Sequence, residues 1–305
     1  MVVPCDGARV AAAAARPFAA VAVDLDGTLL DDGRRISELT MRTLRELVLR
    51  GVHIVVATGR HLHAVTAVAR SLAAYCCGVD GVPRDGAAGF YLIVLNGARV
   101  YSPRGELVVS HNVERDIVHA LYRMFVPLQR AASRDDGLMM SVYQTDVSWV
   151  STAVPLEWAE VFEKPPLVCE DIPTGMPVED VAKVSFRCNN LALLQQHERD
   201  VREKFGGRVV TTMSSRRCLD VMAPGVSKGV SLTRVGAVAQ FDPATDAIAF
   251  GNAMNDEEML ASVAKGCIME NGHERLKEAL PHLEVVGSNN DDGVARKLRE
   301  VFNLD

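Results

Sequence analysis

Two acidic residues directly follow the first apolar run that resembles a buried strand. The run is Phe18–Val23, and Asp24 and Asp26 come next with one residue between them. Paired carboxylates can divide a reaction, because one can attack while the other transfers a proton. They can also bind a hard cation such as Mg²⁺, which usually takes one or two carboxylates. Gly27 permits an ordinary turn here, so the pair alone does not identify a site.

Two other segments place polar side chains where a strand gives way to a helix. Thr58 ends the strand-like run His53–Ala57 and offers a hydroxyl group. Lys228 lies at the predicted start of a helix, where the partial positive charge of the helix terminus also favours an anion. Both residues therefore suit a site that holds a negatively charged group.

A third group of polar side chains follows the strand-like segment Ala247–Gly251. It consists of Asn252, Asn255 and Asp256. In an open α/β sheet, ligands bind at the carboxyl ends of the strands, so all these side chains can reach one edge. Paired acids, a hydroxyl, a cation and amides suit phosphoryl transfer, because that chemistry depends on positioning and charge stabilisation.

The elements that must position these residues alternate between strand and helix at both ends of the chain. Near-continuous apolar strands are typical of a parallel sheet that is covered on both faces. The predicted strands are 18–23, 53–57, 90–95, 247–251, 267–269 and 284–286, and the predicted helices are 37–50, 61–74, 228–239, 256–264, 273–280 and 293–302.

The middle third has a different, α+β pattern that indicates an antiparallel sheet. A Ser-Pro-Arg-Gly turn joins Ala98–Tyr101 to Glu106–Ser110 in a predicted hairpin. The other predicted elements of this part are helices at 113–125, 156–163 and 190–204, and strands at 138–145, 180–188 and 208–213. A further predicted strand, at 218–222, lies near the junction with the core.

We therefore predict an α/β fold with a Rossmann-like, doubly wound parallel sheet as its core and an inserted α+β domain. The core comprises residues 18–100 and 216–305, and the inserted domain comprises residues 101–215. We expect the Ala-rich residues 1–17 to form a disordered leader, with a targeting segment as the alternative.

At these residues the chain resembles the haloacid dehalogenase superfamily of phosphohydrolases. The four motifs of that superfamily are similar, in order, to residues 24–30, Thr58-Gly59-Arg60, Lys228 and residues 251–256. The chain is more narrowly similar to the Cof-type branch, in which a large class IIB cap is inserted between the second and third motifs. The stretches 219–229, 269–272 and 290–294 support this, and the resemblance covers residues 18–305.

The resemblance implies a Mg²⁺-dependent phosphatase that hydrolyses small phosphorylated metabolites through an aspartyl-phosphate. Asp24 would be the nucleophile, Asp26 the acid and base, and Lys228 the cation that offsets the charge of the reacting groups. The implied phosphate- or substrate-binding residues are Thr58, Gly59, Arg60 and Asn255, and the implied metal site consists of Asp24, Asp26, Asn252 and Asp256.

One residue departs from the family pattern. Most members carry Asp, a direct Mg²⁺ ligand, where this chain has Asn252. An Asn side chain can still offer a carbonyl oxygen to a hard cation, but it brings no charge. We therefore expect a working site with weaker Mg²⁺ affinity, and a degenerate site is the alternative.

The sequence is compatible with more than one substrate and more than one reaction. Sugar phosphates are the first expectation, and phosphorylated vitamins such as pyridoxal phosphate come next. The alternative functions are a phosphomutase similar to eukaryotic phosphomannomutases and a catalytically weakened binder of phosphorylated ligands. Asp26 favours phosphate esters over haloacids, because a halide leaving group needs no proton.

Composition excludes other classes of protein. The 305 residues carry 33 basic and 39 acidic side chains, a net charge of −6, which argues against a general binder of nucleic acid. No apolar run approaches the roughly 20 residues of a membrane helix. The seven cysteines contain no Cys-x-x-Cys pair, so we expect reduced thiols and a cytoplasmic location.

Several other residues have simpler predicted roles. His61 and His63 stand two apart on a predicted helix, so we expect no shared face and no metal pair. Lys183 resembles a recurring cap position without an assigned role. We expect large side chains of the inserted domain to fill its core; they are Met139, Met140, Tyr143, Trp149 and Trp158.

Overall fold

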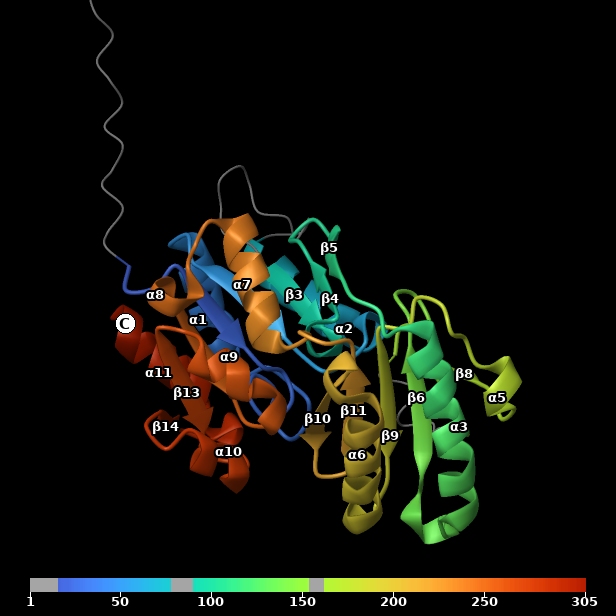
Figure 1. The fold of residues 1–305 in the computed structure, drawn as a ribbon. Helices are drawn as coiled ribbons and strands as arrows, with labels where there is room; N and C mark the ends of the chain where they lie inside the picture. Colours follow the sequence, from blue (N-terminus) through green and yellow to red (C-terminus); the bar gives the residue numbers. More distant parts are fainter. Residues whose placement is uncertain (1–15, 78–89, 154–161) are drawn as a thin grey trace, which may run out of the picture.

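The computed structural model describes residues 16–77, 90–153 and 162–305. It shows two lobes, an α/β core and a smaller cap that lies against one end of it (Figure 1). The predicted leader, except its last two residues, lies outside the described residues, and so do Trp158 and most of the predicted helix 156–163.

The core is built on an eight-stranded sheet whose order is β14-β13-β12-β1-β2-β3-β4-β5. The pairs from β14 to β3 are parallel, and β4 and β5 add an antiparallel edge. The strands are β1 (Ala20–Val23), β2 (His53–Ala57), β3 (Phe90–Val94), β4 (Arg99–Tyr101), β5 (Leu107–Ser110), β12 (Ala247–Gly251), β13 (Lys265–Met269) and β14 (Glu284–Val286).

Helices cover both faces of this sheet, as the apolar strands require. In β1, Val21 and Val23 join one buried cluster, which includes Leu44 of α1, while Ala20 and Ala22 join a cluster on the other face. The predicted doubly wound α/β core is therefore confirmed. Its helices are α1 (Glu38–Leu49), α2 (Leu62–Cys77), α7 (Lys228–Ala239), α8 (Pro243–Asp246), α9 (Glu257–Ala261), α10 (Glu274–Ala279) and α11 (Gly293–Phe302).

The cap is a six-stranded sheet of order β10-β11-β9-β6-β7-β8. It is antiparallel except for β7 and β8, and α3 and α6 pack on one of its faces in a separate apolar cluster. The cap elements are α3 (Arg115–Ala131), β6 (Met139–Tyr143), β7 (Ser148–Val150), β8 (Leu167–Val168), α5 (Ile172–Gly175), β9 (Lys183–Arg187), α6 (Leu191–Phe205), β10 (Val210–Ser215) and β11 (Cys218–Met222).

Short 3₁₀ turns connect several of these elements. They span Leu95–Gly97, Arg134–Asp136, Gly206–Arg208, Met254–Asp256 and Asn289–Asp291. Among the residues that the structure describes, no helix combines the length and apolar character needed to cross a bilayer.

The two sheets divide the chain at different residues from the predicted domain boundaries. The prediction assigns residues 101–110 to the inserted domain, but β5 extends the core sheet. It assigns residues 218–222 to the core, but β11 pairs with β9 and β10 in the cap sheet. By sheet membership the cap begins after Ser110 and ends with Met222. The prediction missed these boundaries because the identity of the sheet that a strand joins leaves no local sequence signal.

Burial of His197 in the cap predicts a loss of stability on mild acidification. Its ring packs edge-on against Phe186, with centroids 4.4 Å apart, and its Nε2 has no hydrogen-bond partner among the described residues. Burial lowers the pKa of His197 from 6.5 to about 4. The unfolded chain therefore binds a proton first as the pH falls below 6.5, and the folded state loses stability until the pH reaches about 4.

Replacing His197 with Leu removes this effect. Between pH 7 and pH 5, the free energy of unfolding, measured with urea, should fall by about 1–2 kcal/mol less in His197→Leu than in the parent chain. His119→Gln, at an exposed position on α3, is the control and should keep the parental slope. An unchanged pH dependence in His197→Leu would contradict the burial argument.

Candidate active site

The loop after β1 holds Asp24 at the floor of the site. The Asp24 N–H donates to the carbonyl oxygen of Phe250 at 3.0 Å, and the chain then turns through Gly27 with a φ of +74°. A Cβ at Gly27 would lie 2.3 Å from Nδ2 of Asn252. The positive φ favours glycine at this position, and any larger residue would also require the Asn252 side chain to move.

A buried lysine joins two carboxylates that come from different segments. Lys228 begins α7, and its Nζ donates to Oδ1 of Asp24 and to Oδ1 of Asp256, both at 2.6 Å. Lys228 and Asp256 are fully buried, and Asp24 is nearly so. Oδ2 of Asp256 accepts the backbone N–H groups of Asn252 and Ala253 at 2.9 and 3.0 Å. Asp256 thus positions both the lysine and the loop that carries Asn252.

This arrangement contains one more negative charge than positive charge. Burial and the charge of Asp256 raise the pKa of Asp24 to about 7, and Lys228 opposes them only in part. Burial alone would lower the pKa of Lys228, but the charges of Asp24 and Asp256 outweigh it and raise that pKa. An additional cation at Asp24 would be favoured, because it would neutralise the surplus charge.

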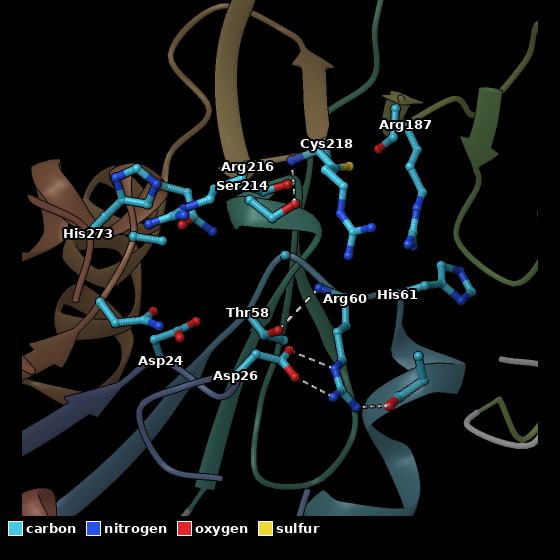
Figure 2. Close-up of a pocket in the computed structure, with 18 of the residues that line it drawn as sticks. Asp24, Asp26, Thr58, Arg60, His61, Arg187, Ser214, Arg216, Cys218 and His273 are labelled. Carbon is cyan, nitrogen blue, oxygen red and sulfur yellow. Dashed lines mark hydrogen bonds and ion pairs between the residues drawn. The ribbon is translucent and has the colours of Figure 1, made fainter. Parts of the chain in front are cut away.

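Asp26 turns toward Arg60 rather than toward the lysine. Arg60 Nε donates to Oδ2 of Asp26 at 2.8 Å, and a second guanidinium nitrogen donates to Oδ1 (Figure 2). Oγ1 of the buried Thr58 accepts the Arg60 N–H at 3.1 Å, which fixes the turn between them. The Asp26 carboxylate is half-exposed, so it can meet a substrate in the space above it.

A cavity of about 840 Å³ lies between the core loops and the cap sheet. The predicted site residues on its wall are Asp24, Asp26, Thr58, Gly59, Arg60, Asn252 and Asn255. Lys228 and Asp256 lie beneath the floor and act on the cavity through Asp24. The structure therefore brings all the predicted site residues together at one edge of the sheet.

The cap contributes residues to this wall that were expected to fill its core. Met140 is fully buried in the cap cluster and Trp149 packs against it, as predicted. Met139 and Tyr143 instead line the cavity, so the prediction was wrong for them. Residues alternate across a strand, and the sequence alone did not show which face of β6 meets the helices.

A buried polar network, which was not predicted from the sequence, joins the cap to the core. Asp220 of β11 is fully buried and accepts hydrogen bonds from Nζ of Lys183 at 3.1 Å and from Nδ2 of Asn96 at 2.7 Å. A third bond comes from Oγ of Ser185. Asp220 thus binds polar groups from both lobes.

This network reaches the predicted phosphate-binding loops. Nζ of Lys183 also donates to the carbonyl oxygen of Gly59 at 2.7 Å. Oδ1 of Asn96 accepts from Nδ2 of Asn255 at 3.0 Å, and Asn96 adopts a left-handed φ of +57°. Two features of the sequence could have indicated this network. They are the acidic residue Asp220 within an apolar strand and the Asn-Gly pair that follows β3.

His61 and His63 form a second contact between the lobes. Their ring centroids lie 5.1 Å apart, and the Nε2 atoms lie 2.9 Å from the carbonyl oxygens of Gln144 and Asp146 in the cap. The expectation that they share no face was wrong, because α2 begins only at Leu62. Burial lowers the pKa of His61 to about 4.

The donor chemistry at the floor fits a magnesium ion. In the described ranges, no cluster of three or more His, Cys, Asp or Glu side chains is arranged to bind a metal. Mg²⁺ does not require one, since it usually keeps several waters and takes one or two carboxylates. Asp24, Asp26 and Asn252 line the same cavity, whereas both oxygens of Asp256 are already engaged, so Asp256 suits a supporting role.

Comparisons with known proteins match this chain to one family of hydrolases. Residues 21–298 match the haloacid dehalogenase-like hydrolase family. A protein of Haemophilus influenzae is 35% identical over 294 residues, which are 95% of this chain and 98% of that protein. An HMP-PP phosphatase of Escherichia fergusonii is 31% identical over 279 residues, or 91% of this chain and 93% of the relative.

Solved structures agree on the fold. A haloacid dehalogenase-like hydrolase from Bacteroides thetaiotaomicron superposes with a TM-score of 0.74 at 20% identity, over 93% of this chain and all of that one. A sugar phosphatase of haloacid dehalogenase subclass IIB superposes with a TM-score of 0.70 at 18% identity, over 94% of this chain and 99% of that one.

The pair formed by Lys183 and Asp220 generates a stability prediction. Lys183→Met leaves a fully buried carboxylate without its cation, so we expect a loss of about 3 kcal/mol in the free energy of unfolding, measured with urea. Adding Asp220→Asn should recover part of the loss, because the amide is neutral. A double variant as unstable as Lys183→Met would show that the ion pair is not the cause.

Proposed function

This chain belongs to the haloacid dehalogenase-like hydrolase family, and we propose that it is a Mg²⁺-dependent phosphatase of small phosphorylated metabolites. The observation that carries the proposal is the buried carboxylate of Asp24, held by Lys228 at the floor of a cavity that Asp26 also faces. The cap closes the cavity from above, which suits small substrates.

The first step transfers the phosphoryl group to the protein. An oxygen of Asp24 attacks phosphorus while the bond from phosphorus to the ester oxygen breaks, and protonated Asp26 gives its proton to that leaving oxygen. Asp26 must first separate from Arg60, whose guanidinium can then bind the substrate instead. Lys228 offsets the charge at Asp24, and Thr58 and Asn255 orient the phosphoryl oxygens.

The second step returns the phosphoryl group to water. Asp26, now ionised, takes a proton from a water molecule as that water attacks phosphorus. The bond between phosphorus and Asp24 breaks, which releases orthophosphate and restores both carboxyl groups. The cap wall limits the number of water molecules near the intermediate, so hydrolysis uses the one that Asp26 activates.

Asp24, the backbone carbonyl of Asp26 and the side chain of Asn252 are the groups that would hold Mg²⁺. When bound, the ion supplies positive charge that neutralises the phosphoryl oxygens and the attacking carboxylate. The surplus negative charge around Lys228 supports this assignment.

Sugar phosphates are the first candidates for the substrate, and phosphorylated vitamins come next. The names of the relatives, which include an HMP-PP phosphatase and a subclass IIB sugar phosphatase, agree with small phosphorylated compounds. A phosphomutase would return the phosphoryl group to the sugar, and a binding protein would release nothing. Release of free phosphate distinguishes the phosphatase from both alternatives.

Asp24→Asn tests the nucleophile. We expect phosphate release from p-nitrophenyl phosphate to fall at least roughly 1,000-fold, because a neutral amide cannot form the acyl-phosphate. Asp200→Asn, at an exposed position on α6, is the matched control and should keep the parental rate. An active Asp24→Asn protein would exclude the mechanism.

Asn252→Asp tests the metal assignment. A second carboxylate at the floor should lower the half-saturating Mg²⁺ concentration about tenfold, measured both by activity and by the Mg²⁺-dependent rise in melting temperature. The same half-saturating concentration in both proteins would remove Asn252 from the metal site.

A further inference from the structure

We propose that Asn96 is a positioning residue for phosphate binding. Its amide holds the amide of Asn255 so that an N–H group, and not the carbonyl oxygen, is offered to the substrate. This inference rests on the proposed phosphatase function and assigns a further residue to its anion site. The arrangement that carries it is a chain of three side chains, in which Asp220 binds Asn96 and Asn96 binds Asn255.

The carboxylate of Asp220 fixes the direction of the Asn96 amide. Asp220 is fully buried and pairs with the ammonium group of Lys183 at 3.1 Å, so its oxygens act as acceptors. Nδ2 of Asn96 donates to Oδ2 of Asp220 at 2.7 Å. If this amide were turned over, its oxygen would face a carboxylate oxygen, and the two acceptors would repel each other. The amide nitrogen of Asn96 therefore faces Asp220.

The amide oxygen of Asn96 in turn fixes the amide of Asn255. It accepts a hydrogen bond from Nδ2 of Asn255 at 3.0 Å. This bond uses one of the two hydrogens on that nitrogen, and the other remains for a ligand. Asn255 lines the cavity, so its remaining N–H group suits an oxygen of a phosphoryl group.

The carbonyl oxygen of Asn255 does not help to hold this amide. Its Oδ1 is buried and has no hydrogen-bond partner among the residues that the structure describes. An unpartnered acceptor in the interior is unfavourable, so another contact must keep the amide in this orientation. The bond from Nδ2 of Asn255 to Asn96 is the contact that does so.

A strained turn places Asn96 beside the predicted phosphate-binding loop. Leu95, Asn96 and Gly97 have consecutive φ values of +52°, +57° and +107°, a conformation that Asn tolerates better than Leu does. The N–H of Asn96 donates to the carbonyl oxygen of Thr58 at 3.0 Å, and the N–H of Leu95 donates to that of Arg60 at 3.0 Å. Strain of this kind persists where surrounding contacts impose it, and it is common at functional sites.

The lack of a side chain at Gly59 leaves space for the Asn96 amide. A Cβ at Gly59 would lie 2.8 Å from Oδ1 of Asn96. Gly59 is not one of the glycines with a positive φ, so its backbone conformation does not require glycine. The amide of Asn96 is bonded at both ends and would have to give up a bond to make room.

Asn96→Gly tests the proposal, because it removes the amide and glycine adopts the left-handed conformation readily. The probe is orthophosphate, used as a competitive inhibitor of p-nitrophenyl phosphate hydrolysis at fixed Mg²⁺. We expect KM and the inhibition constant of orthophosphate each to rise about tenfold, while kcat falls less than about threefold, because the lost interaction binds ground state and transition state alike. A role in stability alone would lower the folded fraction, and therefore kcat, and would leave KM and the inhibition constant unchanged.

Asn303→Gly is the matched control. Asn303 also has a left-handed φ, of +48°, but it is exposed at the end of α11. The same substitution there should leave KM, kcat and the inhibition constant of orthophosphate at their parental values.

Two double variants test whether Asn96 acts through its neighbours. Asn255→Ala alone should raise the inhibition constant about tenfold, and adding Asn96→Gly should then change it less than about twofold, because the amide that Asn96 positions is already gone. Gly59→Ala should also raise the inhibition constant, because its new Cβ displaces the Asn96 amide. In the Asn96→Gly protein, Gly59→Ala should have little further effect, because the Cβ then has room.

The outcomes separate this proposal from the proposed function. If the inhibition constant of Asn96→Gly stays parental, or if the effects of Asn96→Gly and Asn255→Ala multiply, the positioning role is wrong while the phosphatase assignment stands. If the parent protein releases no phosphate from p-nitrophenyl phosphate, the proposed function fails and the positioning role fails with it. If Asn96→Gly does not fold, a parental inhibition constant in Gly59→Ala would still contradict the proposal, and a raised one would support it.

Discussion

The site depends on the two ion pairs that the ammonium group of Lys228 forms with Asp24 and Asp256. The ammonium group lies in a fully buried position and contacts carboxylates from the first strand loop and from the loop after β12. Without that cation, Asp24 and Asp256 would place two unpaired charges in the interior, which is costly. The topology makes the contact possible, because β1 lies between β2 and β12 and α7 begins beside their carboxyl ends.

The network around Asp220 gives the cap a defined position over this floor. Lys183 links the buried acid to the carbonyl of Gly59, and Asn96 links the same acid to Asn255. A movement of the cap away from the core must break these bonds or carry the core loops with it. Closure of the cap and alignment of the loops that carry Gly59 and Asn255 are therefore parts of one arrangement.

Elements that depend on a local sequence pattern were predicted correctly, whereas contacts between residues far apart in the chain were not predicted. The bounds of β12, β14 and α11 were predicted to the residue, because each combines an apolar pattern with clear turn or cap residues. The loops that carry Asp24, Thr58 and Lys228 could be placed because they follow or precede such elements. By contrast, the bond from Asn96 to Asp220 joins residues 124 positions apart, and no local pattern records it. The same limit explains why β5 and β11 were assigned to the wrong lobes.

The most direct test of the central claim is a rapid acid quench of the protein during turnover of a ³²P-labelled phosphate ester, followed by peptide mapping. Asp24, held by Lys228, should carry the label as an acid-stable, hydroxylamine-sensitive acyl-phosphate. With labelled p-nitrophenyl phosphate, whose leaving group needs no proton, Asp26→Asn should increase the labelled fraction, because hydrolysis of the intermediate still needs the base. A protein that releases labelled phosphate without any labelled intermediate, or that carries the label on another residue, would contradict the account.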